Sequence, residues 1–281
     1  MMLNSIVFAG ITPHPPLLVP AVGGSRVERV ADSQRALREF SRRLVETRPD
    51  TIVVISPHSP LDPHSFTARS TETVSGDFRE FLVPAVRLSF DNDLELLRAI
   101  KLDAAAQGVA FIELQGEHPL DHGALVPLYY LYEAGWRGRV AVIGFTFQSN
   151  DAHLAFGRSI ANAAAAIGRS VALVASGDLS HRLIIDGPYH YEPTAHLFDE
   201  QIVDAIGRGD ASAVINIDPD LRDRAGECGY RSIVIALGAV GEDLRENEVL
   251  SYEGPFGVGY MVAVLADAGR RDAGSNEPTN H

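Results

Sequence analysis

Short apolar runs alternate with longer amphipathic segments along most of this chain, and that alternation limits the folds open to it. Residues 51–56 (TIVVIS) are almost wholly apolar, as is typical of a strand buried on both faces of a sheet. Residues 25–46 instead repeat their apolar side chains at close to the period of a helix. A chain in which strands and helices alternate is expected to fold as an α/β domain around a largely parallel or mixed sheet.

The same patterns predict the order of the other elements. We expect further strands at residues 5–10, 86–90, 109–114, 139–145, 170–176, 248–252 and 257–265. We expect further helices at residues 91–107, 151–167, 193–207 and 229–241. No Pro/Gly/Ser-rich linker divides the chain, so we expect one domain over residues 1–268, with a central mixed sheet flanked by helices. The polar, patternless stretch over residues 269–281 is expected to be disordered.

Charge and cysteine content exclude several functions. The 281 residues carry 24 Lys and Arg against 37 Asp and Glu, a net charge of −13, so neither nucleic acid nor an anionic membrane is an expected partner. The single cysteine, Cys228, cannot form an internal disulfide, which favours a reducing compartment. The N-terminus shows no signal peptide, and no apolar run approaches the roughly 20 residues of a membrane helix. We therefore expect a cytoplasmic protein.

Four of the ten histidines stand where an α/β sheet gathers its functional groups. His14 (TPHPP) and His58 (SPHSP) follow two predicted strands, and His181 (SGDLSH) follows a third. His122 (DHG) stands at the expected start of a helix. Ligands bind at the carboxyl ends of the strands in open α/β sheets. The three histidines that follow strands are therefore expected to meet at one edge.

A metal centre is the chemistry that this arrangement favours. Neutral imidazole is the commonest metal ligand in proteins. Two histidines and one carboxylate form the usual non-haem Fe(II) site, and the same donors hold Zn(II) in hydrolytic sites. An isolated histidine after a strand more often caps or hydrogen-bonds. A plain α/β domain with structural histidines therefore stays open as an alternative.

The third ligand is not decided by the residues. Asp178 lies near His181 and could be the third ligand. It can equally orient the His181 ring by a hydrogen bond without binding the metal itself. Glu227 (GECG) precedes a predicted helix, where the helix dipole stabilises a carboxylate in any case. Cys228, next to it, is either a soft metal ligand or a small buried hydrophobic residue.

Six short motifs in a fixed order resemble one family. They are PHPP from Pro13, SPH from Ser56, DHG from Asp121, SGDLSH from Ser176, ECG from Glu227 and PFGVGY from Pro255. Together they resemble the class III extradiol ring-cleavage dioxygenase superfamily (LigB-like), over about residues 6–266. Within it, the chain looks most similar to the branch associated with the AmmeMemoRadiSam system, which includes the Memo-like proteins.

The resemblance implies a function and a set of site residues. It implies that residues 1–268 form a catalytic domain in which Fe(II) and O2 open a catecholic ring, and it favours a homodimer acting on a small aromatic substrate. The implied metal ligands are His14, His58 and Glu227. The implied catalytic histidines are His181 and His122. Asp178, Asp121 and Cys228 are implied to support the metal ligands without binding the metal, or to contact the substrate. A Memo-like metal-binding protein without ring cleavage, and a hydrolase using Zn(II) or another divalent metal, are the alternatives.

Overall fold

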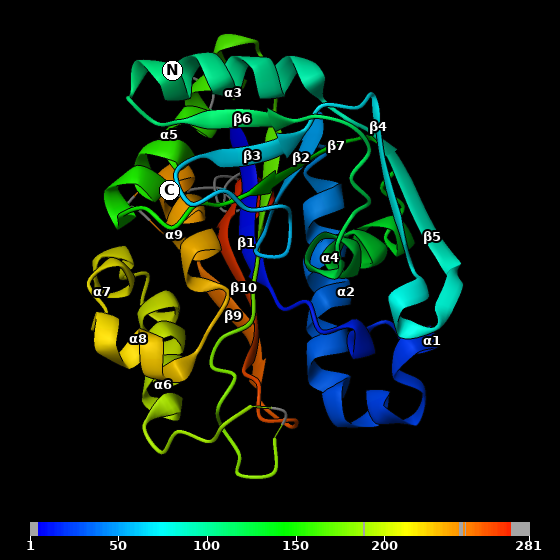
Figure 1. The fold of residues 1–281 in the computed structure, drawn as a ribbon, viewed down its shortest axis with the longest axis vertical. Coiled ribbons are helices and arrows are strands. Elements are labelled where there is room, and N and C mark those ends of the chain that lie inside the picture. The colour runs from blue at the N-terminus through cyan, green and yellow to red at the C-terminus, as the bar shows by residue number, and fades with distance from the viewer. Residues whose placement is uncertain (1–4, 188, 242–243, 245, 271–281) are drawn as a thin grey trace, which may run out of the picture.

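The computed structural model describes residues 5–187, 189–241, 244 and 246–270 (Figure 1). Most of the predicted disordered tail, residues 271–281, lies outside the described residues. The strands are β1 (Ile6–Thr12), β2 (Thr51–Ser56), β3 (Phe66–Arg69), β4 (Thr73–Phe78), β5 (Val83–Asp91), β6 (Phe111–Leu114), β7 (Arg139–Gly144), β8 (Val171–Ser176), β9 (Glu248–Glu253) and β10 (Tyr260–Asp267). The α-helices are α1 (Pro20–Gly23), α2 (Ala31–Glu46), α3 (Leu94–Ala106), α4 (His122–Glu133), α5 (Asn150–Ala166), α6 (Ala195–Gly207), α7 (Ala211–Ile215), α8 (Pro219–Ala225) and α9 (Tyr230–Val240).

Eight strands form one mixed sheet in the order β6-β3-β7-β2-β8-β1-β10-β9. Its centre is parallel, because β8 pairs in parallel with both β1 and β2, and β2 pairs in parallel with β7. The β10 strand runs antiparallel to β1, and β3 runs antiparallel to β7. The expected α/β class with a central mixed sheet is confirmed.

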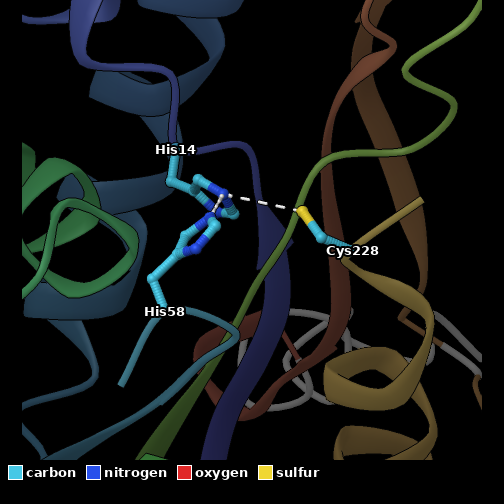
Figure 2. Close-up of side chains that lie close together, drawn as sticks. All are labelled: His14, His58 and Cys228. Carbon is cyan, nitrogen blue, oxygen red and sulfur yellow. Dashed lines mark hydrogen bonds between the residues drawn. The ribbon is translucent and has the colours of Figure 1, made fainter. Parts of the chain in front are cut away.

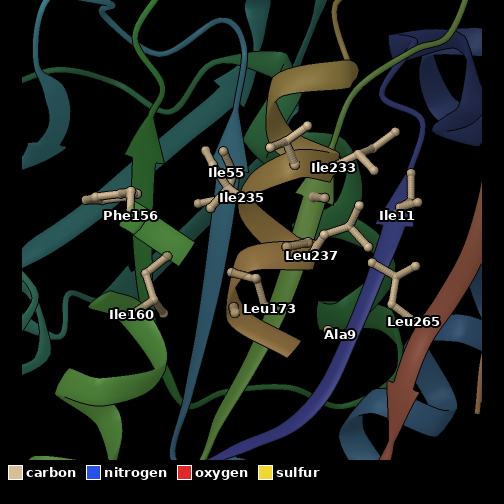
Figure 3. Close-up of a cluster of buried hydrophobic side chains, with 14 of the residues drawn as sticks. Ala9, Ile11, Ile55, Phe156, Ile160, Leu173, Ile233, Ile235, Leu237 and Leu265 are labelled. Carbon is tan, nitrogen blue, oxygen red and sulfur yellow. The ribbon is translucent and has the colours of Figure 1, made fainter. Parts of the chain in front are cut away.

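Helices cover both faces of this sheet because side chains alternate along each central strand (Figure 1). In β2, Val53 and Ile55 face one cluster of buried side chains, whereas Ile52 and Val54 face the other. Figure 3 shows the first cluster, where α5 and α9 pack on the sheet. The second cluster lies under α2 and α4. No helix in the described part of the chain is long and apolar enough to cross a membrane.

Two expectations are corrected in detail. The α2 helix begins at Ala31, and residues 24–30 form a 3-10 helix in place of the first turns predicted from residue 25. The predicted strand at residues 86–90 lies within β5, but β5 pairs with β4 in a separate two-stranded sheet. Alternation shows that a segment is half-buried, but it does not show which strand becomes its neighbour.

The β4–β5 hairpin packs on the segment that precedes α4. The backbone N–H of Leu120 donates to Ser75 O at 2.9 Å. A Cβ added at Gly76 would lie 2.7 Å from Leu120 O, so only glycine allows this approach. The hairpin is thereby held beside the N-terminus of α4, where His122 lies.

Candidate metal centre

Three parallel strands bring their following loops to one edge of the sheet. Thr12, at the end of β1, pairs with Ser176, at the end of β8, and Ile55 of β2 pairs with Ala175. His14 and His58 each follow two residues after their strand, and His181 follows five residues after β8. The structure brings all three histidines together, as the sequence predicts.

Figure 2 shows His14, His58 and Cys228 pointing toward one another from three separate segments. The Nε2 atoms of His14 and His58 are 3.0 Å apart, and Cys228 Sγ lies 3.6 Å from His14 Nε2. The potential ligand atoms of the three residues all lie within 4.8 Å of one another. In tetrahedral geometry around Zn(II), two nitrogens lie roughly 3.3 Å apart, and a nitrogen and a sulfur lie roughly 3.6 Å apart. These donors therefore fit a single metal ion.

Hydrogen bonds fix the orientation and tautomer of His14. The Ser176 hydroxyl donates to Gly123 O at 2.5 Å, so its oxygen is left to accept from His14 Nδ1, 3.0 Å away. His14 Nε2 then has no proton and presents its lone pair to the cluster. The His14 backbone N–H also donates to Asp178 Oδ1 at 3.0 Å. Partners of this kind outside the ligand shell orient metal-binding imidazoles.

Burial keeps these imidazoles neutral. Burial lowers the pKa of His14 well below its ordinary value, and the neighbouring imidazoles lower it further. Partial burial also lowers the pKa of His58. Metal ions bind the neutral ring, so both histidines are in the form that ligation needs.

Cys228 reaches the centre because two loops pack without side chains between them. A Cβ at Gly177 would lie 2.0 Å from the Gly229 Cα, so this contact requires glycine. The backbone N–H of Asp178 donates to Cys228 Sγ at 3.3 Å. Burial raises the pKa of the thiol well above its usual value. The thiol therefore keeps its proton until a cation displaces it.

Glu227 does not lie with His14 and His58, although the resemblance implies that it is the third metal ligand. Its Oε2 accepts from the Tyr230 backbone N–H at 2.6 Å, at the first turn of α9. Among the described residues, Glu227 belongs to neither group of closely spaced ligand atoms. The alternative that it is a helix N-terminal carboxylate therefore describes its position, and it is the adjacent Cys228 whose sulfur lies near His14 and His58.

The other two histidines flank the centre. The His122 ring stacks on the His58 ring with 4.2 Å between their centroids. The Phe81 ring contacts the His122 ring edge-on, with 5.6 Å between centroids. His181 Nε2 lies 3.7 Å from Cys228 Sγ, and its ring stacks on Tyr189 at 4.9 Å. Burial lowers the pKa of both His122 and His181 to about 4.

The predicted outer carboxylates occupy different positions. Asp178 Oδ2 lies 3.8 Å from His14 Nε2 and 4.0 Å from His181 Nε2, and burial raises the pKa of this carboxyl to about 7. Asp178, His181 and Cys228 form a second group of closely spaced ligand atoms. Asp121 instead caps α4 by accepting from the Ala124 N–H. Asp178 thus borders the centre directly, and Asp121 supports the helix that carries His122.

A cavity opens on one side of the centre. It has a volume of about 570 Å³ and lies between the start of α4 and the β4–β5 hairpin. His58 and His122 line it on one side, and Phe81, Arg79 and Arg87 line the hairpin side. The centre therefore adjoins a space large enough for a small molecule.

Two buried side chains of the site were missed by the sequence analysis. Ser176 is the last residue of β8, and its hydroxyl holds the His14 ring. Arg69 ends β3 and donates to Ser59 Oγ, beside His58. The SGDLSH motif already contained Ser176, whereas no pattern around Arg69 distinguishes it from a surface arginine.

The fold and the clustered donors define an α/β protein with a candidate metal site at the carboxyl ends of its parallel strands. The family described as the catalytic LigB subunit of aromatic ring-opening dioxygenase matches residues 9–263. The chain therefore belongs to the LigB family. Members of this family are metal-dependent, which agrees with the cluster of His, Cys and Asp side chains.

Two individual proteins are similar to the chain. Protein CA_C1420 of Clostridium acetobutylicum is 30% identical over 263 residues, which cover 91% of this chain and 56% of that protein. The chain thus spans little more than half the length of this curated relative. The crystal structure of the uncharacterized protein JW3007 from Escherichia coli K12 matches with a TM-score of 0.58 and 18% identity, over 81% of this chain and 91% of that one. This second likeness supports the fold.

Proposed function

We propose that this chain is a metal-binding protein whose ion is held by His14 Nε2, His58 Nε2 and the Cys228 thiolate. The observation that carries the proposal is the convergence of these three atoms, all within 4.8 Å of one another, from three separate segments. The tautomer that Ser176 imposes on His14 supports it, because the free lone pair then points into the cluster.

The thiolate changes the choice between the functions that the family offers. Ring-opening sites of the non-haem Fe(II) kind use two histidines and a carboxylate. Here the carboxylate that would serve, Glu227, bonds the start of α9. Two imidazoles and a thiolate suit zinc, copper or iron, because soft thiolate favours softer ions than carboxylate does. This donor set favours the Memo-like alternative, a metal-binding protein without ring cleavage.

Extradiol ring cleavage is the second candidate function, and one observation favours it. The cavity beside His58 and His122 has room for a small aromatic molecule. A bound Fe(II) would supply the chelation of a catechol and the activation of O2. The protein's part would be proton transfer, for which the neutral His122 and His181 side chains serve as bases. A zinc hydrolase on the same ligands is the third candidate.

Metal content and O2 consumption separate these functions. The protein is purified without oxygen, and bound metals are measured in the wild type, His14→Ala and Cys228→Ser. His153→Ala is the matched control, since His153 is as buried as His14, but its ring nitrogens lie 2.8 Å and 3.0 Å from the backbone carbonyl oxygens of Ser149 and Thr146, away from the cluster. We expect near-stoichiometric metal in the wild type and the control, and loss of metal in the two site variants.

Oxygen uptake with a panel of catechols then decides the reaction. Uptake that requires catechol, together with a new yellow product, would support ring cleavage. Metal binding without uptake would support the Memo-like function, and zinc with esterase or amidase turnover would support the hydrolase. Absence of metal from the wild type, even after reconstitution with Fe(II), Zn(II) and copper, would overturn the metal centre.

A further inference from the structure

Arg69 is a buried cation that lies beside the candidate metal centre, outside the group of ligand atoms. Its side chain is 2% exposed. Its Nε donates to His118 O at 2.8 Å, and its Nη2 donates to Pro119 O at 2.7 Å. Its Nη1 donates to Ser59 Oγ at 3.0 Å. One guanidinium thus ties the loop after β2 to the segment that leads into α4.

Asp121 completes this connection. Its Oδ2 lies 3.4 Å from Arg69 Nη2 and accepts from Ser59 Oγ at 3.1 Å. Its Oδ1 accepts from Ser56 Oγ and from the Ala124 N–H at the first turn of α4. The Arg69–Asp121 pair therefore joins both ends of the 56–59 loop to the N-terminus of α4.

The two segments joined in this way carry two of the imidazoles. His58 lies inside the 56–59 loop, and His122 follows Asp121 directly. Their rings stack at 4.2 Å with an interplanar angle of 29°. The loop also decides how far His58 Nε2 lies from His14 Nε2, at present 3.0 Å. A shift of the loop against α4 would move His58 relative to both other rings.

We propose that Arg69 is a positioning residue that sets the orientation of His58 toward the metal and against His122. It acts through Ser59 and Asp121 and touches neither the metal ligand atoms nor the cavity. Lysine cannot replace it, because its donors radiate from one atom, whereas Arg69 reaches four separate acceptors with a planar fork. The affinity part of the test below rests on the metal centre proposed above.

Arg43 supplies a matched control for a merely structural role. It is also buried, at 6% exposure, and donates to Asp267 Oδ2 at 3.0 Å and to Glu248 Oε2 at 2.8 Å. These partners lie at the other end of β1, where Asp267 pairs with Phe8. Losing Arg43 therefore removes a buried ion pair without disturbing the loops that carry the histidines.

Cobalt(II) binding to Arg69→Met, Arg69→Lys and Arg43→Met tests the proposal. Each variant is first shown to be folded by circular dichroism, and its unfolding midpoint is measured. We expect Arg69→Met to bind Co(II) about 10–100-fold more weakly than the wild type, with altered visible bands, as for other residues that orient ligands. We expect Arg69→Lys to bind more weakly as well. Arg43→Met is expected to unfold at lower denaturant but to keep the wild-type affinity and spectrum.

A second readout uses the metal-free protein. The ring Cε1–H signals of His58 and His122 are compared by NMR at one pH, with the signal of His153 as the internal control. We expect both signals to shift in Arg69→Met, because the stacking of the two rings changes, and His153 to stay unchanged. If the wild type binds no Co(II), the proposed metal centre fails, and these signals alone decide the role of Arg69.

Several results would overturn the proposal. Folded Arg69→Met with wild-type histidine signals would do so, as would wild-type Co(II) affinity in that variant. Equal weakening in Arg43→Met at equal loss of stability would reduce Arg69 to a structural residue. If neither Arg69 variant folds, Ser59→Ala removes one of the guanidinium's acceptors without leaving a buried charge. The Ser59→Ala variant must then shift the NMR signal of His58 for the proposal to stand.

Discussion

At the scale of single residues, two neighbours in sequence have opposite roles. Glu227 turns toward the backbone of Tyr230, while Cys228 turns toward the imidazoles. Burial raises the pKa of both side chains, so ionising either of them costs free energy. The proposed metal ion would offset that cost for the thiolate, whereas the Tyr230 N–H and nearby arginines offset it for the carboxylate.

The first prediction compares these two neighbours. Cys228→Ser is expected to weaken metal binding by more than the roughly 10–100-fold typical of an outer partner, because it removes a proposed ligand. Glu227→Gln keeps an oxygen that accepts from Tyr230, so it is expected to retain wild-type metal content and stability. Equilibrium binding and denaturant unfolding of both variants check this. Loss of metal in Glu227→Gln alone would restore Glu227 as the ligand.

The second prediction concerns pH. The Cys228 pKa is raised, so the thiol is protonated near neutrality and must lose one proton when a metal binds. The pKa values of His14 and His58 are lowered, so these rings have already lost theirs. The dissociation constant for Zn(II) or Co(II) is therefore expected to fall about tenfold per pH unit between pH 6.5 and roughly 8. A pH-independent constant, or no proton release into a weakly buffered indicator, would contradict it.

At the scale of elements, the contact between α5 and α9 depends on glycine. A Cβ at Gly157 would lie 2.1 Å from Ile235 O, and a Cβ at Gly238 would lie 2.4 Å from Leu154 O. The two helices therefore approach each other backbone to backbone. Because α9 begins directly after the Cys228 loop, this packing also fixes where that loop starts.

The third prediction tests this packing with two glycines. Gly157→Ala is expected to lower the free energy of unfolding by about 1–3 kcal/mol, because the helices must separate. Gly207, in α6, has nothing within 4 Å of its Cβ position, so Gly207→Ala is expected to raise stability by roughly 0.5–1 kcal/mol through its helix propensity. Urea unfolding of both variants measures this. A stable Gly157→Ala protein would show that the two helices separate at little cost.

At the scale of the whole molecule, Asp199 joins parts that are distant in the chain. From α6, its Oδ1 accepts from the Ser180 N–H at 2.8 Å, and its Oδ2 accepts from the Tyr252 hydroxyl of β9 at 2.7 Å. The side chain is fully buried, and burial raises the pKa of this carboxyl to about 7. It thus links a helix, the loop after β8 and the edge strand through a group that resists ionisation.

The fourth prediction follows from that raised pKa. Below about pH 4, Asp199 is protonated in both the folded and the unfolded chain. As the pH rises toward 7, the unfolded chain ionises first, so this group's contribution to stability is lost up to about pH 7 and then stays constant. Asp199→Asn keeps an acceptor for Ser180 without ionising. Its stability relative to the wild type is expected to rise across this range, by at most about 4 kcal/mol.

Denaturant unfolding at pH 5 and pH 8 measures that difference. A gain for Asp199→Asn at pH 8 that shrinks at pH 5 is the expected result. The same gain at both values would contradict the raised pKa, because it would show an effect unrelated to ionisation.

The sequence by itself determined the class of fold and the meeting of three histidines. Apolar runs such as Thr51–Ser56 specify buried parallel strands, and parallel strands end at one edge of the sheet. Residues that closely follow those ends, such as His14 and His58, must therefore lie near one another. This is a consequence of topology and needs no knowledge of side-chain packing.

The tertiary structure alone decided which side chain joins His14 and His58 and which residues support that cluster. Glu227 and Cys228 are adjacent in an irregular segment, and the close approach of Gly177 and Gly229 decides which of them faces the imidazoles. Arg69 has acceptors about 50 residues away in the chain, at His118 and Pro119. Local sequence patterns report only on neighbours within a few residues. Contacts between distant loops depend on how the whole chain packs.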